Sequence, residues 1–191
     1  AIEKNSSGRF KCIVPQHLEQ STSRSVEIRN NDLLQIVKSD LILLNFDGTE
    51  LDSGTVVEFL FAKVLDIPAV ILRTDFRSAG DQDRGDPWNL MCSAYPRTRI
   101  ITLNSMTWYQ EEWKKGGEIS EIMERFYKKL SRKINNEFEI VLRESPIYDN
   151  EKILSNVYEW AINFPGSGFK DLFKEEDLKN LILKKQKKDL F

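Results

Sequence analysis

The chain has 191 residues, of which 40% are hydrophobic and 30% charged, and its formal net charge is −2. This length and composition fit one globular domain, or one domain with an extension, that buries a hydrophobic core. The chain lacks the basic surplus of nucleic-acid binders and has no apolar run near the ~20 residues of a membrane span. Neither nucleic acid nor a membrane is therefore expected as a partner.

Cysteine and histidine are too scarce for several kinds of site. The two cysteines, Cys12 and Cys92, define no disulfide framework and favour a reducing compartment, so we expect a cytoplasmic protein. The single histidine, His17, makes a Cys/His zinc site implausible and leaves a Ser-His-Asp triad one candidate base. Acid–base chemistry would then depend on carboxylates.

Predicted strands and helices alternate along the first two-thirds of the chain. Residues 10–14 are predicted to form a short strand. Apolar residues at roughly helical spacing then predict a helix that begins at residue 25 and ends before Asp40. The nearly continuous apolar run 40–46 is typical of a strand that is covered on both faces in a parallel sheet.

The following elements extend this sheet. A helix over about 53–65 and an apolar strand at 69–73 complete a βαβ unit with a right-handed crossover. The polar stretch 74–87 is predicted to be a loop, residues 99–103 a strand, and residues 118–134 an amphipathic helix. The alternation predicts an α/β, doubly wound (flavodoxin- or Rossmann-like) parallel sheet with helices on both faces.

The C-terminal part is predicted to be helical only. Residues 150–164 and 169–191 have helical patterns, and the stretch "PGSG" at 165–168 separates them. We therefore expect an α/β domain over residues 1–137 and a helical C-terminal extension over 138–191.

A lysine cluster lies near the end of this extension, at Lys184, Lys185, Lys187 and Lys188. A solvated helix end, favoured by the helix dipole, is the expected explanation of this cluster. A nuclear-localisation patch is the alternative.

Carboxylates gather where the predicted strand 40–46 leads into the next helix. Open α/β sheets bind ligands outside the carboxyl ends of their strands, and Asp47 and Asp52 lie in that position. Gly54 would allow a ligand to approach the backbone closely. Glu58 lies roughly one turn into the helix among apolar neighbours, where the helix dipole favours an ionised carboxylate.

Structural roles explain some of these residues equally well. Helix capping alone accounts for Asp52, and Glu58 is as readily a helix-surface residue as a catalytic one. The sequence contains neither a G-x-G-x-x-G after a strand nor a G-x-x-x-x-G-K-[ST] motif, so no dinucleotide fingerprint or P-loop is present. Paired carboxylates are typical of glycosyl transfer, in which one attacks the anomeric carbon and another protonates the leaving group.

Three stretches stand in a characteristic order: "NNDLLQIVKSDLIL" (30–43), "DSGTVVE" (52–58) and "GDPWNLM" (85–91). Together they resemble the nucleoside 2-deoxyribosyltransferase family, including its separation of six between the Asp and the Glu of the second motif. The resemblance covers about residues 10–134.

The resemblance implies a mechanism. Glu58 matches the nucleophile that attacks C1′ of a 2′-deoxynucleoside and forms a deoxyribosyl-enzyme ester. Two successive displacements would retain configuration and give ping-pong kinetics. Asp40 and Asp52 match the carboxylates that manage the proton of the base and hold the sugar. The partners implied are a deoxynucleoside and a free nucleobase, with no metal or organic cofactor.

The third motif implies a shared pocket. Asn89 and Met91 match residues that complete the pocket of a neighbouring subunit, so a homo-oligomer is expected. Trp88 is a candidate for stacking on the base, with core packing as the alternative. Asp47 and Gly54 complete the expected substrate-binding set.

The chain also departs from the family pattern. Val56 and Leu60 replace small residues near Glu58. The glycine-rich substrate loop that follows the family's first strand has no counterpart ahead of Phe10, and the chain opens at Ala1 without a methionine. An N-terminal strand is therefore expected to be missing. Besides transfer, two alternatives stand: hydrolysis of deoxynucleosides or their 5′-monophosphates by the same glutamate, and a non-catalytic nucleotide-binding or scaffold module.

Overall fold

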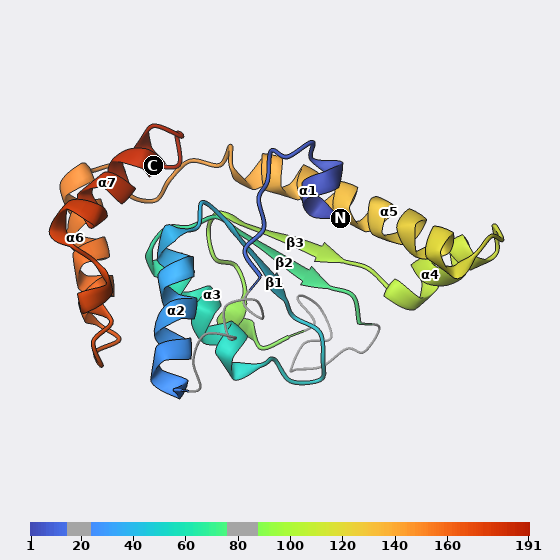
Figure 1. Cartoon of the computed structure of the whole chain (residues 1–191), viewed down its shortest axis with the longest axis horizontal. Helices are drawn as coiled ribbons and strands as arrows, with labels where there is room; N and C mark the ends of the chain where they lie inside the picture. The colour runs from blue at the N-terminus through green and yellow to red at the C-terminus, as the bar shows by residue number, and fades with distance from the viewer. Residues whose placement is uncertain (15–23, 76–87) are drawn as a thin grey trace.

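A three-stranded parallel sheet forms the centre of the molecule (Figure 1). The computed structural model describes residues 1–14, 24–75 and 88–191. The strands in these ranges are β1 (Ile42–Asn45), β2 (Ala69–Arg73) and β3 (Thr98–Thr102), in the spatial order β1-β2-β3. Because the strands are parallel, their carboxyl ends and the loops that follow them lie at one edge of the sheet.

Helices cover both faces of this sheet. Their bounds are α1 (Ile2–Asn5), α2 (Ser25–Lys38), α3 (Ser53–Val64), α4 (Ser105–Trp113), α5 (Ile119–Val141), α6 (Glu151–Asn163) and α7 (Glu175–Gln186), with 3-10 turns η3 (Leu90–Cys92) and η4 (Lys170–Leu172).

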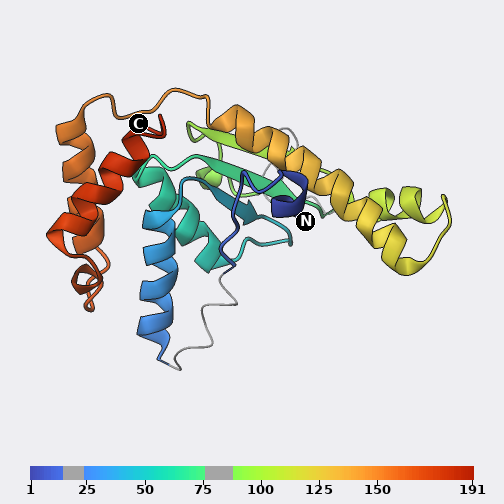
Figure 2. The ribbon, with the colours of Figure 1, turned by 45° about the horizontal axis from the view of Figure 1, so that its top comes forward.

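Alternate side chains of β2 point to opposite faces of the sheet and pack against different helices. Ala69 and Ile71 share a core with Phe59 of α3, whereas Val70 shares another with Ile134 and Phe138 of α5. The helix α5 therefore crosses one face and α3 the other (Figure 2). The predicted α/β fold, a parallel sheet with helices on both faces, is confirmed.

The predicted elements nearest the carboxylates agree with the structure. The helix α2 ends at Lys38, before Asp40, and β2 has the predicted bounds 69–73. The helix α3 begins directly after Asp52, whose side chain accepts a hydrogen bond from the Thr55 amide at 2.8 Å and so caps the helix.

The strand predicted at 10–14 is wrong, because these described residues form no strand. The Cys12 amide donates to the Glu3 carboxylate at 2.7 Å rather than to a neighbouring strand. The Phe10 ring packs edge-on against Phe138 of α5, with centroids 4.9 Å apart. Phe10 is thus used in packing on a helix, whereas Ile13 and Val14 stay exposed. Residues 76–87 of the predicted loop 74–87 lie outside the described residues, as does His17.

Two differences concern the helices after β3. The sequence patterns did not predict α4, which Asn104 caps by accepting from the Thr107 amide at 3.0 Å. The helix predicted at 118–134 is longer and ends at Val141, because Phe138 and Val141 continue its buried face. The predicted domain boundary after residue 137 therefore falls inside α5.

The helices α6 and α7 pack beside α2 and α3, as both overall views show (Figures 1 and 2). One apolar cluster joins the four helices, and its buried members include Leu33, Ile36, Phe61, Leu65, Leu154, Tyr158, Ile162 and Ile182. The Tyr158 hydroxyl also donates to the Leu65 carbonyl at 3.3 Å. The C-terminal helices therefore share a core with the helix that carries Glu58.

Buried polar contacts add to this packing. Arg97 and Asp66 form an ion pair at 2.9 Å, and their side chains are 1% and 0% exposed. Arg97 also donates to the Leu190 carbonyl at 2.9 Å. In the lysine cluster, Lys185 is buried and donates to the Ser39 carbonyl, and Lys188 pairs with Asp40 at 2.6 Å. Two of the four lysines are thus engaged in the fold.

Candidate carboxylate site at the start of α3

Asp52 lies directly before the first turn of α3, at the carboxyl edge of the sheet. Its carboxylate accepts from the Thr55 amide at 2.8 Å and from the Thr55 hydroxyl at 3.1 Å. These hydrogen bonds stabilise the ionised form, so the pKa of Asp52 lies below its usual value. A Cβ at Gly54 would lie 3.1 Å from Asp52 Oδ1. The glycine therefore leaves room for the capping carboxylate.

Glu58 lies at the margin between the buried and the exposed face of α3. Its neighbour Phe59 is fully buried and its neighbour Val57 is exposed, while Glu58 itself is half-buried. Burial raises the pKa of Glu58, and the negative charges of Asp32 and Asp52 raise it further. The side chain is neither sealed in the core nor isolated in solvent.

Asp32 is a member of this carboxylate group that the sequence analysis missed. It lies on α2, which packs against α3, and its charge acts on Glu58 more strongly than that of Asp52 does. A signal for it was present in the sequence. Asp32 precedes buried Ile36 by four residues, so helical spacing places it beside the apolar face of α2.

Asp40 lies apart from this group, at the amino end of β1. Its carboxylate accepts from the Lys188 ammonium at 2.6 Å, so the segment that follows α7 reaches the start of the strand. Among the described residues, the charges that raise the pKa of Glu58 belong to Asp32 and Asp52. The charge of Asp52 thus acts on Glu58, whereas Asp40 is paired with Lys188.

Asp47 binds backbone groups of the loop that follows β2. Its carboxylate accepts from the Thr74 amide at 2.5 Å, the Thr74 hydroxyl at 2.7 Å and the Asp75 amide at 2.9 Å. These three bonds give it a structural function at the sheet edge, and its expected contact with substrate stays a prediction.

The three residues expected from the third motif differ in exposure. Trp88 is 2% exposed and packs edge-on against Phe46 at 5.3 Å, so core packing is the role that its placement supports. Asn89 is exposed and caps η3 by accepting from the Met91 amide at 2.9 Å. Met91 is 72% exposed, which is unusual for so large an apolar side chain.

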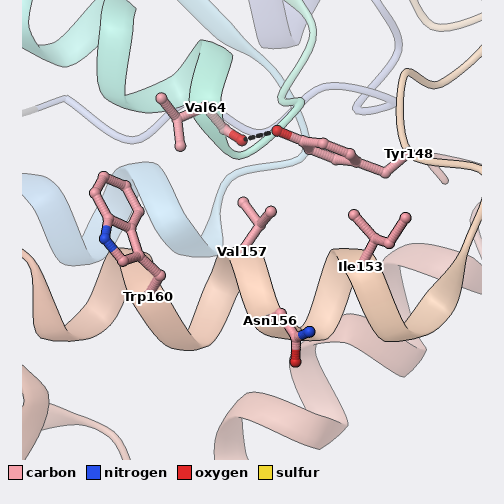
Figure 3. Close-up of a pocket in the computed structure, with 6 residues that line it drawn as sticks. All are labelled: Val64, Tyr148, Ile153, Asn156, Val157 and Trp160. Carbon is pink, nitrogen blue, oxygen red and sulfur yellow. Dashed lines mark hydrogen bonds between the residues drawn. The ribbon is translucent and has the colours of Figure 1, made fainter.

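A shallow cavity of about 260 Å³ lies elsewhere, between the end of α3 and α6 (Figure 3). Ile153, Val157 and Trp160 of α6 point towards Val64 and Tyr148, and the Tyr148 hydroxyl donates to the Val64 carbonyl at 2.9 Å. None of the carboxylates described above lines it.

The fold and this carboxylate group define an α/β protein whose candidate site lies at the carboxyl edge of a parallel sheet. Residues 5–91 match the family model described as nucleoside 2-deoxyribosyltransferase, which confirms the resemblance drawn from the motifs. This part of the chain is therefore similar to the nucleoside 2-deoxyribosyltransferase family. The match includes Asp32, Asp52 and Glu58 and ends before β3. No curated protein and no solved structure matches the chain.

Two further findings concern other classes of site. Within residues 1–14, 24–75 and 88–191, no group of three or more His, Cys, Asp or Glu side chains is arranged to hold a metal ion. None of the helices in these ranges combines the length and the apolar composition needed to cross a membrane.

Proposed function

We propose that the chain transfers 2-deoxyribose between nucleobases with Glu58 as the nucleophile. The observation that carries the proposal is the half-buried Glu58 carboxylate on α3, within the part of the chain that matches the family. Its pKa is raised by burial and by the charges of Asp32 and Asp52. A half-buried carboxylate remains accessible to a substrate. Its perturbed pKa is typical of residues at functional sites.

The proposed reaction consists of two displacements. In the first, a Glu58 carboxylate oxygen attacks C1′ of the deoxynucleoside, and the C1′–N bond breaks with its electron pair leaving on the base, which takes up a proton. In the second, a ring nitrogen of an incoming base attacks C1′ and gives up its proton, and the ester bond to Glu58 breaks. The carboxylate is regenerated, and configuration at C1′ is retained.

The grouped carboxylates suit the charge that develops in this reaction. Positive charge accumulates on the sugar ring as the C1′–N bond breaks, and fixed negative charges stabilise it. Asp52 supplies such a charge because hydrogen bonds from Thr55 keep it ionised. The same positive charge would relieve the repulsion that raises the pKa of Glu58.

We propose that Asp32, rather than Asp40, exchanges the proton with the base: its protonated form donates to the leaving base, and its carboxylate accepts a proton from the incoming base. Asp32 acts electrostatically on Glu58, whereas Asp40 is paired with Lys188 at the other end of β1. We further propose a homo-oligomer in which Asn89 and the exposed Met91 complete the pocket of a second copy, as the family resemblance implies.

The test is incubation of the full chain with deoxyinosine, with and without adenine. Formation of deoxyadenosine together with hypoxanthine is the expected result. Hypoxanthine and free deoxyribose without deoxyadenosine would instead identify a hydrolase, and binding without turnover would identify a non-catalytic module.

The nucleophile is tested separately with Glu58→Gln. This variant should lose exchange by at least about 10³-fold, since the neutral amide is a far weaker nucleophile, while its thermal unfolding remains close to that of the wild type. Glu50→Gln, a change of an exposed glutamate in the preceding loop, is the matched control and should retain exchange. Unchanged exchange in Glu58→Gln would remove Glu58 from the mechanism.

A further inference from the structure

The side chain of Arg73 links the loop that follows β1 to the loop that follows β2, at the carboxyl edge of the sheet. Arg73 is the last residue of β2 and is 1% exposed. Its guanidinium donates to the Phe46 carbonyl and, at 3.0 Å, to the Gly48 carbonyl, both in the loop that follows β1. A buried cation is thus used to hold the backbone of the adjacent loop.

The second loop is bound in return. The Asp47 carboxylate accepts from the Thr74 amide and hydroxyl and from the Asp75 amide, at 2.5 to 2.9 Å. The Asp75 carboxylate accepts from the Gly48 amide at 3.1 Å. We refer to these contacts among residues 46–48 and 73–75 as the loop clamp. Each loop supplies both donors and acceptors to the other, so the clamp opposes their separation from both sides.

Backbone features at both ends restrict the clamp further. Gly48 has a φ of +105°, and a Cβ there would lie 3.1 Å from the Glu50 carbonyl oxygen, so the turn requires glycine. On the other side, the Thr74 carbonyl accepts from the Ser105 amide at 3.0 Å and from the Ser105 hydroxyl at 3.1 Å. The start of α4 is thereby joined to the clamp.

The clamp is close in sequence to the carboxylate site. Only residues 49–51 separate Gly48 from Asp52, and Leu51 packs against the same apolar cluster as Phe59 of α3. Asp52 then caps α3, and Glu58 follows on the same helix. A displacement of the clamped loop would therefore be transmitted to the helix cap and to the first turn of α3.

We propose that Arg73 and Asp47 are positioning residues, which hold the 46–52 loop so that Asp52 and Glu58 keep the geometry needed to react with a sugar. The reaction itself rests on the proposed function. This positioning role follows from their hydrogen bonds to the two loops and requires no contact with substrate.

The clamp is tested first without any assay of activity. Hydrogen exchange of backbone amides in residues 46–56 should be at least about tenfold faster in the full-length Arg73→Met variant, and less accelerated in Arg73→Lys, which keeps a cation. Arg99→Met is the matched control, since Arg99 lies on β3 and pairs with Glu137 at 3.1 Å. Asp47→Asn provides a second test should Arg73→Met fail to fold.

The effect on the reaction is tested by rapid mixing with deoxyinosine. The rate constant for release of the first base should fall by about 10- to 100-fold in Arg73→Met and Asp47→Asn, because misplacement by about 1 Å has effects of this size. The burst amplitude per mole of total protein should stay at the wild-type value. A merely structural role would instead lower the amplitude and leave the rate constant unchanged, which would overturn the positioning role.

The two proposals fail in different ways. Absence of base release from the wild type would overturn the proposed function, while hydrogen exchange would still decide whether the clamp orders the loop. Wild-type exchange rates over residues 46–56 in both Arg73→Met and Asp47→Asn would overturn the clamp, whatever reaction the protein catalyses.

Discussion

The buried ion pair between Asp66 and Arg97 connects α3 to the C-terminal helices, and its disruption should cost much stability. The Asp66 carboxylate contacts Arg97 at 2.9 Å and accepts from the Ile147 amide at 2.8 Å, with both side chains almost wholly buried. Asp66→Asn keeps a side chain that tolerates the observed φ of 54° and removes only the charge. Loss of one partner of a buried pair costs about 3–5 kcal/mol, because the other charge stays buried without compensation.

Urea unfolding of the full chain would measure this effect. With an m-value of about 2 kcal/mol/M, Asp66→Asn should lower the midpoint by roughly 1.5–2.5 M. The control is Glu137→Gln, which breaks the more exposed pair with Arg99 and should cost about 1 kcal/mol or less. If Asp66→Asn lowers the free energy of unfolding by less than about 1 kcal/mol, the inference that its loss leaves the Arg97 charge buried without compensation is wrong.

Three other measurements follow from the same contacts. Because its surroundings raise the pKa of Glu58, kcat/KM should fall on acidification at a pH above 4.5, and Asp52→Asn should move this limb to lower pH by removing one repelling charge. Burial lowers the pKa of Lys63 and Lys185 from 10.5 to about 8, so the unfolded chain binds more protons between these values. The free energy of unfolding should therefore rise with pH across that range, and less so in Lys63→Met, as urea titrations at several pH values would show. Phe138→Ala should lower the free energy of unfolding by about 3–5 kcal/mol, since this buried ring packs against the sheet. A loss below about 1 kcal/mol would indicate that residues from 138 onwards are separate from the α/β core.

Several elements were predictable because local patterns agree with their environment. The strand β2 is a short apolar run after Pro68, and α2 and α3 have apolar residues at helical spacing. The apolar run at 10–14 satisfies the same rules but pairs with no strand, and only its Phe10 packs against α5. Local composition does not distinguish these outcomes, since pairing depends on which neighbour is available.

The candidate site illustrates the same division. The motif around Glu58 predicted its helix and its position near the helix start, and it included Asp52, which caps the same helix. The choice between Asp32 and Asp40 depended on how α2 packs against α3 and on where α7 ends. Both aspartates lie within one predicted motif, so the sequence pattern alone did not separate them.

The amino-acid sequence by itself determined the alternation of strands and helices and the three motifs that indicate the family, because these features depend on residues close together in the chain. The tertiary structure alone decided which carboxylates act on Glu58, that Trp88 lies in the core, and that Arg73 binds the loop after β1. The physical reason is that electrostatic repulsion, burial and side-chain hydrogen bonds depend on distances in space. In this chain those distances are set by the packing of helices and loops that are far apart in sequence.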